Sequence, residues 1–330
     1  MIPTVVSISG GTKIRASVAA LAAGFLSAAL AEQQQLTAPA TESRVAVDNT
    51  SLHVRVAGRG QPMIVLHGGP DFDTAYLLPE LDQLTDAYRL IYYDQRGRGK
   101  SAEGVRPEEV TLASDLADLD AIRTRYQVDA PVLLGHSWGT VLALEYALRN
   151  PSRVSRLILM NPAPVSASQL AVLRTSYVGQ LGSEMERQRE IMASTAYKEG
   201  EPETVAARYR IHFRHALRQA ADYDKLMARM SAQFRAQGTN GILKAWAIES
   251  RLYRDTWDIA DYDLLPKLRS LRTPTLVIVG EHDFIPTEIA AQIASALPGA
   301  TLATIKDCGH FAYLECGAEV RKAIDNFFSR

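Results

Sequence analysis

The chain has 330 residues, 47% of them hydrophobic, and is long enough to bury the core of one α/β domain that carries an insertion. Its 36 basic and 37 acidic residues give a formal net charge of −1, which leaves no basic excess to neutralise nucleic-acid phosphates or bind an anionic membrane surface. We therefore expect a small molecule or a short peptide as the partner, and no nucleic acid.

The N-terminal segment has the pattern of an export signal. Lys13 and Arg15 precede an apolar and small-residue run of 16 residues that ends at Ala31. Such a run is shorter than the roughly 20 residues of a membrane-spanning helix, and its last residues suit a signal peptidase. The sequence predicts a signal peptide at 1–31, a tether at 32–43 and a periplasmic or secreted mature protein without a membrane span. An uncleaved anchor or a helical extension is the alternative.

Strand patterns begin after this tether. Two alternating segments at 44–47 and 52–56 predict an antiparallel hairpin, because a polar turn separates them. Continuous apolar runs then predict strands that helices cover on both faces, which is typical of a mainly parallel sheet. These runs lie at 63–69, 90–94, 132–137, 156–162 and 275–283, and a last strand is expected at 301–305.

A long helical stretch interrupts the strand pattern. Residues 164–263 are rich in good helix formers and predict a helical cap, inserted into an α/β core made of 44–163 and 264–330. Because the insertion follows one parallel strand and precedes the next, we expect it over the carboxyl edge of the sheet, where ligands bind. Its arginines at helical spacing are expected on a solvated face; they include Arg208, Arg210, Arg214 and Arg218.

The segment GHSWG at 135–139 fits the pattern G-x-S-x-G and lies between a predicted strand and a predicted helix. A sharp turn of this kind exposes the serine at the helix N-terminus, where the helix dipole favours developing negative charge. The sequence therefore predicts Ser137 as the nucleophile of a serine hydrolase.

A serine hydroxyl needs a base, and the base needs a group that fixes its tautomer. Asp283 ends a predicted strand, and His310 follows the last one, which gives the chain order Ser, Asp, His. We predict His310 as the base and Asp283 as the orienting acid. Glu281 and Asp307 are the competing acids.

The oxyanion of the reaction needs two backbone donors. The amide of Trp138, directly after the nucleophile, is one candidate, and the amide of Gly69, in the HGGP loop after the first parallel strand, is the other. The chemistry requires no cofactor. The histidines are spread without the spacing of a metal site, so no metal is expected.

The mature chain contains two cysteines, Cys308 and Cys316. In an oxidising compartment they can pair, although the sequence does not show whether their side chains meet. Cys308 as a nucleophile is a weaker hypothesis, because it lies only two residues before the expected base.

The motifs HGGP at 67–70, DQRGRGKS at 94–101, GHSWGT at 135–140, GEHD at 280–283 and GHF at 309–311 occur in this order. Together they resemble the proline iminopeptidase group of α/β-hydrolases. The resemblance implies the α/β-hydrolase fold, and it implies the same triad and oxyanion residues. It also implies a structural role for the loop that contains Asp94 and Arg96.

The resemblance further implies that cap carboxylates bind the free amino terminus of the substrate. Glu203 and Glu249 are the candidates, and Asp71 stands where the family has a glycine. The expected activity is release of N-terminal proline, or a similar residue, from short peptides or amides through an acyl-enzyme. An esterase, lactonase or xenobiotic amidase is the alternative, and a ligand-binding protein without turnover is a minor one.

Overall fold

The computed structural model describes residues 39–329. The predicted signal peptide and residues 32–38 of the predicted tether lie outside this range. Strand β1 already begins at Ala40, so the prediction of a tether is wrong for residues 40–43. These residues pair with β2 through their backbone while their side chains remain exposed, and they therefore lack the apolar alternation that marks a strand.

The central sheet has eight strands in the order β1-β2-β4-β3-β5-β6-β7-β8. The pairs β1·β2 and β2·β4 are antiparallel, and all the other pairs are parallel. Each of the predicted strands is present. Their bounds are β1 Ala40–Val47, β2 Thr50–Ala57, β3 Gln61–Leu66, β4 Tyr88–Tyr93, β5 Val132–His136, β6 Arg156–Met160, β7 Thr275–Gly280 and β8 Thr301–Ile305.

Burial follows position in the sheet. Every residue of β5 and of β7 is buried, because helices cover both faces of the central parallel strands. The edge strand β8 alternates between partly buried and exposed residues over most of its length. The continuous apolar runs of the sequence thus correspond to the centre of the sheet, and the core of the protein lies around it.

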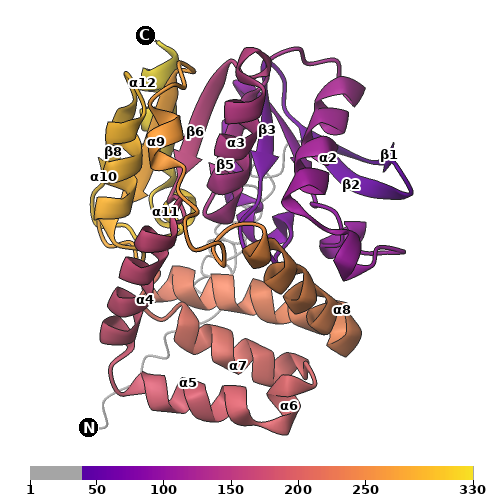
Figure 1. The fold of residues 1–330 in the computed structure, drawn as a ribbon, viewed down its shortest axis with the longest axis vertical. Coiled ribbons are helices and arrows are strands. Elements are labelled where there is room, and N and C mark those ends of the chain that lie inside the picture. The colour runs from indigo at the N-terminus through magenta and orange to yellow at the C-terminus, as the bar shows by residue number, and fades with distance from the viewer. Residues whose placement is uncertain (1–38, 330) are drawn as a thin grey trace, which may run out of the picture. The chain divides into compact units, whose positions relative to one another are not determined.

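The helices of the core follow the strands along the chain, with 3₁₀ turns at Thr74–Leu77, Glu80–Leu84, Gly99–Ser101, Pro107–Glu109 and Pro151–Arg153. Figure 1 shows α2 and α3 beside the first half of the sheet and α10 and α12 beside its C-terminal strands. Their bounds are α2 Leu112–Arg125, α3 Trp138–Arg149, α9 Leu265–Leu268, α10 Thr287–Ala296, α11 Ala312–Glu315 and α12 Gly317–Phe328.

The insertion between β6 and β7 is helical and lies at one end of the strands (Figure 1). Its helices are α4 Ala167–Leu181, α5 Glu184–Ala193, α6 Thr195–Lys198, α7 Pro202–His212 and α8 Ala220–Arg254. Helix α8 is interrupted at Gly238, where φ is 61°. The N–H of Leu264 donates to the carbonyl of Val165 at 3.0 Å, so the two stems of the cap lie side by side. Among the described helices, none is both long and apolar enough to span a membrane.

Candidate active site

Ser137 lies between the last residue of β5 and the first residue of α3, with φ 53° and ψ −120°. A left-handed φ is costly for a residue with a side chain, and it persists only where the surrounding structure enforces it. A Cβ on Gly139 would lie 2.1 Å from the carbonyl oxygen of Leu66, so only glycine fits there. The local geometry is the strand-to-helix turn that the G-x-S-x-G pattern predicts.

His310 and Asp283 lie side by side in the loops after β8 and β7. Nδ1 of His310 is 2.8 Å from Oδ1 of Asp283 and 3.0 Å from Oδ2, and both side chains are buried. Because a carboxylate accepts, Nδ1 carries the proton and Nε2 is left free to accept one. The amide Nδ2 of Asn161 donates to Oδ2 of Asp283 at 2.8 Å, and the N–H of Ile285 donates to Oδ1 at 2.9 Å. The orientation of the acid is therefore fixed.

The competing acids lie elsewhere. Glu281 and Asp307 are exposed, and a carboxylate oxygen of Glu281 accepts the N–H of Asp307 at 3.2 Å. Together with His282 they form the group of three side chains, among residues 39–329, whose potential metal-ligating atoms all lie within 4.8 Å of one another. Exposed acidic groups of this kind are common without an ion. Neither carboxylate bonds to His310 within the described structure.

A buried hydrogen-bond chain links the HGGP loop to the loop of His310. The N–H of Gly68 donates to Oη of Tyr76 at 2.7 Å, and Oη donates to Nδ1 of His136 at 2.8 Å. Nε2 of His136 then donates to the carbonyl of His310 at 3.0 Å. Burial and the nearby His310 lower the pKa of His136 far below its usual value, so the ring is neutral and can both accept and donate.

The two predicted oxyanion donors lie at the same end of the sheet. Gly69 lines the cavity beside Ser137, and the amide of Trp138 belongs to the first residue of α3. Within residues 39–329 neither amide donates to another group of the protein. Gly69 has φ 119°, and a Cβ there would lie 2.3 Å from the backbone nitrogen of Asp71. Glycine is therefore required where the loop turns.

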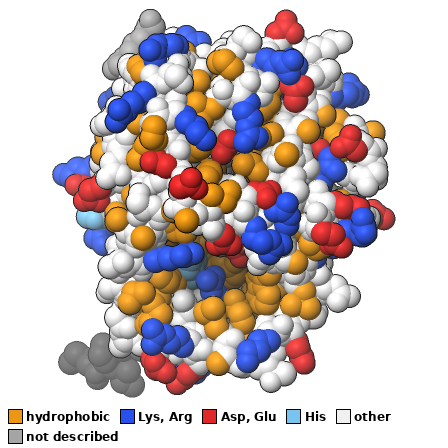
Figure 2. All heavy atoms as spheres, in the orientation of Figure 1, with side chains coloured by type: hydrophobic (Ala, Val, Ile, Leu, Met, Phe, Trp, Pro, Cys, Tyr) orange, Lys and Arg blue, Asp and Glu red, His pale blue; other side chains and the backbone are white. Residues whose placement is uncertain are grey.

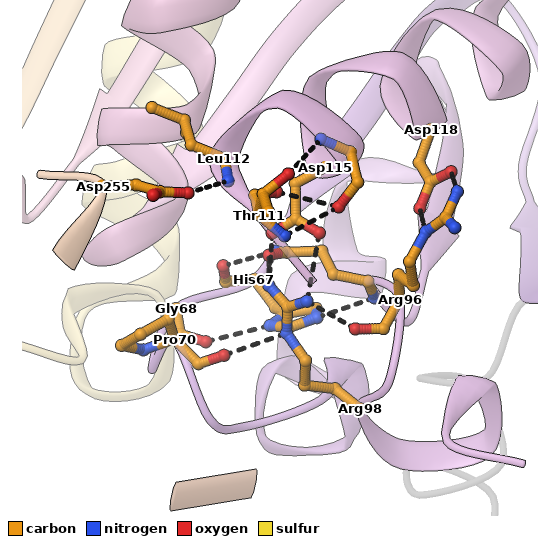
Figure 3. Close-up of polar contacts among 12 residues, drawn as sticks. His67, Gly68, Pro70, Arg96, Arg98, Thr111, Leu112, Asp115, Asp118 and Asp255 are labelled. Atoms are coloured by element: carbon orange, nitrogen blue, oxygen red, sulfur yellow. Dashed lines mark hydrogen bonds and ion pairs between the residues drawn. The ribbon is translucent and has the colours of Figure 1, made fainter. Parts of the chain in front are cut away.

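The DQRGRGKS loop holds the HGGP loop in place through hydrogen bonds (Figure 3). The buried guanidinium of Arg98 donates to the carbonyl of Pro70 at 3.0 Å and to Asp115 on α2. Asp94 accepts backbone N–H groups from two neighbouring turns, and Arg96 is paired with a buried aspartate of α2. These contacts hold backbone in place, and Asp94 and Arg96 are absent from the wall of the cavity.

The cavity has a volume of about 320 Å³ and lies between the core loops and the cap. Ser137, His310 and Gly69 line it from the core, while α7 and α8 contribute side chains from the cap. The lower part of Figure 2, which corresponds to the cap in Figure 1, is hollowed, and a basic side chain is visible inside a largely hydrophobic wall. The volume is at the lower end of the usual range for ligand sites, which suits a ligand of one or two residues.

The structure separates the two cap carboxylates that the sequence singles out. Glu249 on α8 lines the cavity, and its Oε1 accepts a hydrogen bond from Tyr253 at 2.7 Å. Glu203 is exposed on α7 and pairs with Arg235 at 3.3 Å, so its proposed role in substrate binding is a wrong prediction. It precedes the cavity-lining Arg208 by five positions, which turns it about 140° away around the helix.

Two further charged residues line the cavity. Asp71, which the sequence marks only as a departure from glycine, is buried, and its Oδ2 accepts a hydrogen bond from Tyr209 at 2.8 Å. Arg208 also lines the cavity, so the expectation of a solvated helix face is wrong for this arginine, while Arg210 and Arg214 are exposed. An acid at the end of the HGGP loop, beside the nucleophile, is the signal that could have identified Asp71.

The two carboxyl groups in the cavity are difficult to ionise. Burial and the nearby charge of Asp71 raise the pKa of Glu249 from 4.5 to about 7. Burial likewise raises the pKa of Asp71, although the hydrogen bond from Tyr209 opposes the shift. A ligand that brings a positive charge between these groups would favour their ionised forms, because an opposite charge stabilises a carboxylate.

Cys308 and Cys316 form a disulfide, with their Cα atoms 6.3 Å apart. The sequence left this pairing open. The bond closes the loop that contains His310, and it removes Cys308 as a candidate nucleophile.

The family model for the α/β-hydrolase fold matches residues 61–315. The chain is 28% identical to a proline iminopeptidase of Levilactobacillus brevis over 256 residues, which span 77% of this chain and 83% of that protein. It is 25% identical to a proline iminopeptidase of Saccharolobus solfataricus over 280 residues, which span 84% and 87% of the two chains. The crystal structure of a proline iminopeptidase-related protein from Thermus thermophilus matches with a TM-score of 0.65 and 26% identity, over 88% of this chain and 98% of that one.

The matched segment includes all the motifs on which the resemblance rests, from HGGP to GHF. The predicted fold and the predicted relationship are both confirmed. The chain belongs to the α/β-hydrolase family and is a serine hydrolase of the proline iminopeptidase-like type.

Proposed function

We propose that Ser137 attacks the carbonyl carbon of an amide while Nε2 of His310 takes the hydroxyl proton. Asp283 holds the imidazole in the required tautomer and stabilises the imidazolium. The amides of Gly69 and Trp138 stabilise the oxyanion, each by roughly 3 kcal/mol. His310 then returns its proton to the leaving amine, and a water molecule releases the acyl group from Ser137. The hydrogen bond between His310 and Asp283 supports these roles.

The proposed substrate is a short peptide or amide with a free amino terminus, proline first, from which the enzyme releases the N-terminal residue. One observation carries this proposal: two carboxyl groups, the buried Asp71 and the half-buried Glu249, line the same cavity as Ser137. An ammonium group between them would stabilise an ionised carboxylate and gain charge-assisted hydrogen bonds. The small volume of the cavity limits the acyl part to about one residue.

An ester, lactone or amide hydrolase without an amino-terminal requirement is the second candidate. A neutral acyl group would bring neither a cation nor a hydrogen-bond donor of an ammonium group to the two carboxyl groups of the cavity, so it would gain nothing from them. Asp71 and Glu249 therefore favour the peptidase.

The test compares proline 4-nitroanilide with its N-acetylated form and with 4-nitrophenyl acetate. We expect the free-amine anilide to be cleaved at least about 100-fold faster than the blocked one in kcat/KM, since a charged hydrogen-bond partner is lost. Ser137→Ala should abolish turnover, and Glu249→Gln should reduce cleavage of the anilide far more than that of the acetate. Equal cleavage of the free and blocked anilides would exclude the aminopeptidase.

The proposed location is outside the cytoplasm, in the periplasm or the medium. The basic residues and apolar run that end at Ala31, together with the disulfide between Cys308 and Cys316, support export, since such bonds persist in oxidising compartments. Mass spectrometry of the mature protein from fractionated cells tests this: a chain that begins after Ala31 in the exported fraction is expected, and an intact N-terminus in the cytoplasm would contradict it.

A further inference from the structure

Arg208 is a half-buried cation without an ion-pair partner. It lines the cavity from α7, and its Nε is shielded from solvent and makes no hydrogen bond within the described structure. No carboxylate of residues 39–329 forms a salt bridge with it. A partly desolvated guanidinium without an ion-pair partner can bind an anionic group of a ligand in the cavity.

The packing of Arg208 leaves its donors available. The guanidinium carbon lies 4.5 Å from the centre of the Tyr209 ring, in a cation–π contact. The N–H donors lie in the plane of the guanidinium, and no hydrogen bond from them to another group of residues 39–329 is present. This fork of donors matches the two oxygens of a carboxylate.

The nearby carboxyl groups do not take up these donors. Asp71 accepts its side-chain hydrogen bond from Tyr209, and Glu249 accepts its own from Tyr253. Arg208 influences both acids only through its charge. The cavity therefore has two acids that can accept hydrogen bonds from a cationic group of a ligand. It also has one guanidinium without an ion-pair partner that can bind an anionic group.

We propose that Arg208 binds a carboxylate of the acyl group, so that the preferred amino-terminal residue is acidic and carries both an ammonium and a carboxylate group. This inference rests on the proposed aminopeptidase activity and names an acidic residue, in place of proline, as the preferred amino-terminal residue. The ammonium lies with Asp71 and Glu249. The carboxylate is either the side chain of an α-linked acidic residue or the α-carboxylate of a γ-linked glutamyl group, since both present the same pair of charges.

The charge balance of the cavity supports this class of ligand. With one of the two acids protonated, which burial favours, Asp71, Glu249 and Arg208 together carry no net charge. An acyl group with one ammonium and one carboxylate leaves this sum unchanged. Each of its charges also gains a partner, which neither a prolyl group nor a neutral acyl group achieves for Arg208.

The experiment uses the 4-nitroanilides of α-linked glutamate, γ-linked glutamate, glutamine and proline with the full-length enzyme. Glutamate and glutamine differ in charge at nearly constant shape. We expect one glutamyl anilide to exceed the glutaminyl anilide by about 10- to 100-fold in kcat/KM, as for a charge-assisted hydrogen bond. The linkage that is cleaved identifies the source of the carboxylate.

Arg208→Gln should lower this glutamate-to-glutamine ratio by at least about tenfold, mainly through KM, whereas Arg208→Lys should retain part of it. The control is Arg210→Gln, because Arg210 is exposed on the same helix. If Arg208 only balanced the charge of the two acids, Arg208→Gln would change kcat/KM by the same factor for every substrate. That result would overturn the inference.

Failure of the inference differs from failure of the proposed function. Cleavage of proline and glutamine anilides without a preference for either glutamyl anilide overturns the role of Arg208 alone. If no anilide is cleaved, calorimetric titration of Ser137→Ala still decides it, with three ligands: glutamate α-amide, which has only the side-chain carboxylate, glutamine, which has only the α-carboxylate, and glutamine α-amide, which has neither. Tighter binding of one of the first two that Arg208→Gln weakens at least about tenfold supports the carboxylate site, and equal binding of all three overturns it.

Discussion

Glu249 should make the stability of the protein depend on pH in an unusual direction. Its pKa rises from 4.5 to about 7 on folding, so the folded state holds the proton more tightly than the unfolded state does. The stability that the protonated Glu249 contributes to the folded state is complete below about pH 4.5 and is lost as the pH rises through about 7. With about 1.4 kcal/mol per pKa unit, the ionisation of Glu249 lowers the free energy of unfolding by about 3 kcal/mol at pH 8, and about 2.5 kcal/mol of this loss occurs between pH 5 and pH 8.

Glu249→Gln removes the ionisation and keeps an oxygen that can accept the hydrogen bond from Tyr253. Relative to wild type, the variant should gain about 2.5 kcal/mol more in free energy of unfolding at pH 8 than at pH 5. Urea unfolding followed by tryptophan fluorescence at both pH values measures the difference. Glu203→Gln is the matched control, because Glu203 is an exposed glutamate in the same cap and its ion pair should contribute little. A gain of equal size at both pH values would refute the reasoning.

Three further predictions concern the support of the site. Tyr76→Phe should cost about 1–3 kcal/mol of stability in thermal unfolding and reduce kcat, because it leaves the N–H of Gly68 and Nδ1 of His136 without a partner; an unchanged kcat would contradict this. Arg98→Met should cost about 3–5 kcal/mol in urea unfolding, since it leaves the buried Asp115 unpaired, whereas the exposed Lys100→Met should change little. Replacing both cysteines by alanine should cost about 2–3 kcal/mol and make the stability insensitive to a reducing agent, and a variant as stable as the oxidised wild type would show that the bond contributes nothing.

The proximity of the proposed reacting residues could be predicted because their positions follow from topology. The carboxyl ends of parallel strands meet at one edge of the sheet, so a serine after β5, an aspartate after β7 and a histidine after β8 come together without any knowledge of packing. A motif at the end of a parallel strand therefore indicates where its residues lie in the fold, whereas a motif within a helix does not.

The proposed specificity residues could not be predicted in the same way. Whether a helical residue faces the cavity depends on how the helix docks, and α7 is charged on several sides. Arg208 and Glu203 look alike in sequence as charged residues at helical spacing, yet one lies in the cavity and the other on the surface. Asp71 belongs to a core loop, but its burial depends on Tyr209 in the cap. The start of β1 was missed for a related reason, since its exposed side chains carry no pattern.

The cap is joined to the reacting loops by the residues that form the site. The N–H of His310 donates to the carbonyl of Ala216 in the cap at 2.7 Å, and Asp71 of the HGGP loop is held by Tyr209 of α7. A displacement of the cap would therefore move the proposed base and the proposed amine-binding acid together with the cavity wall. For this reason, substitutions in the cap should change kcat as well as KM, whereas a cap that only selects the substrate would leave kcat unchanged.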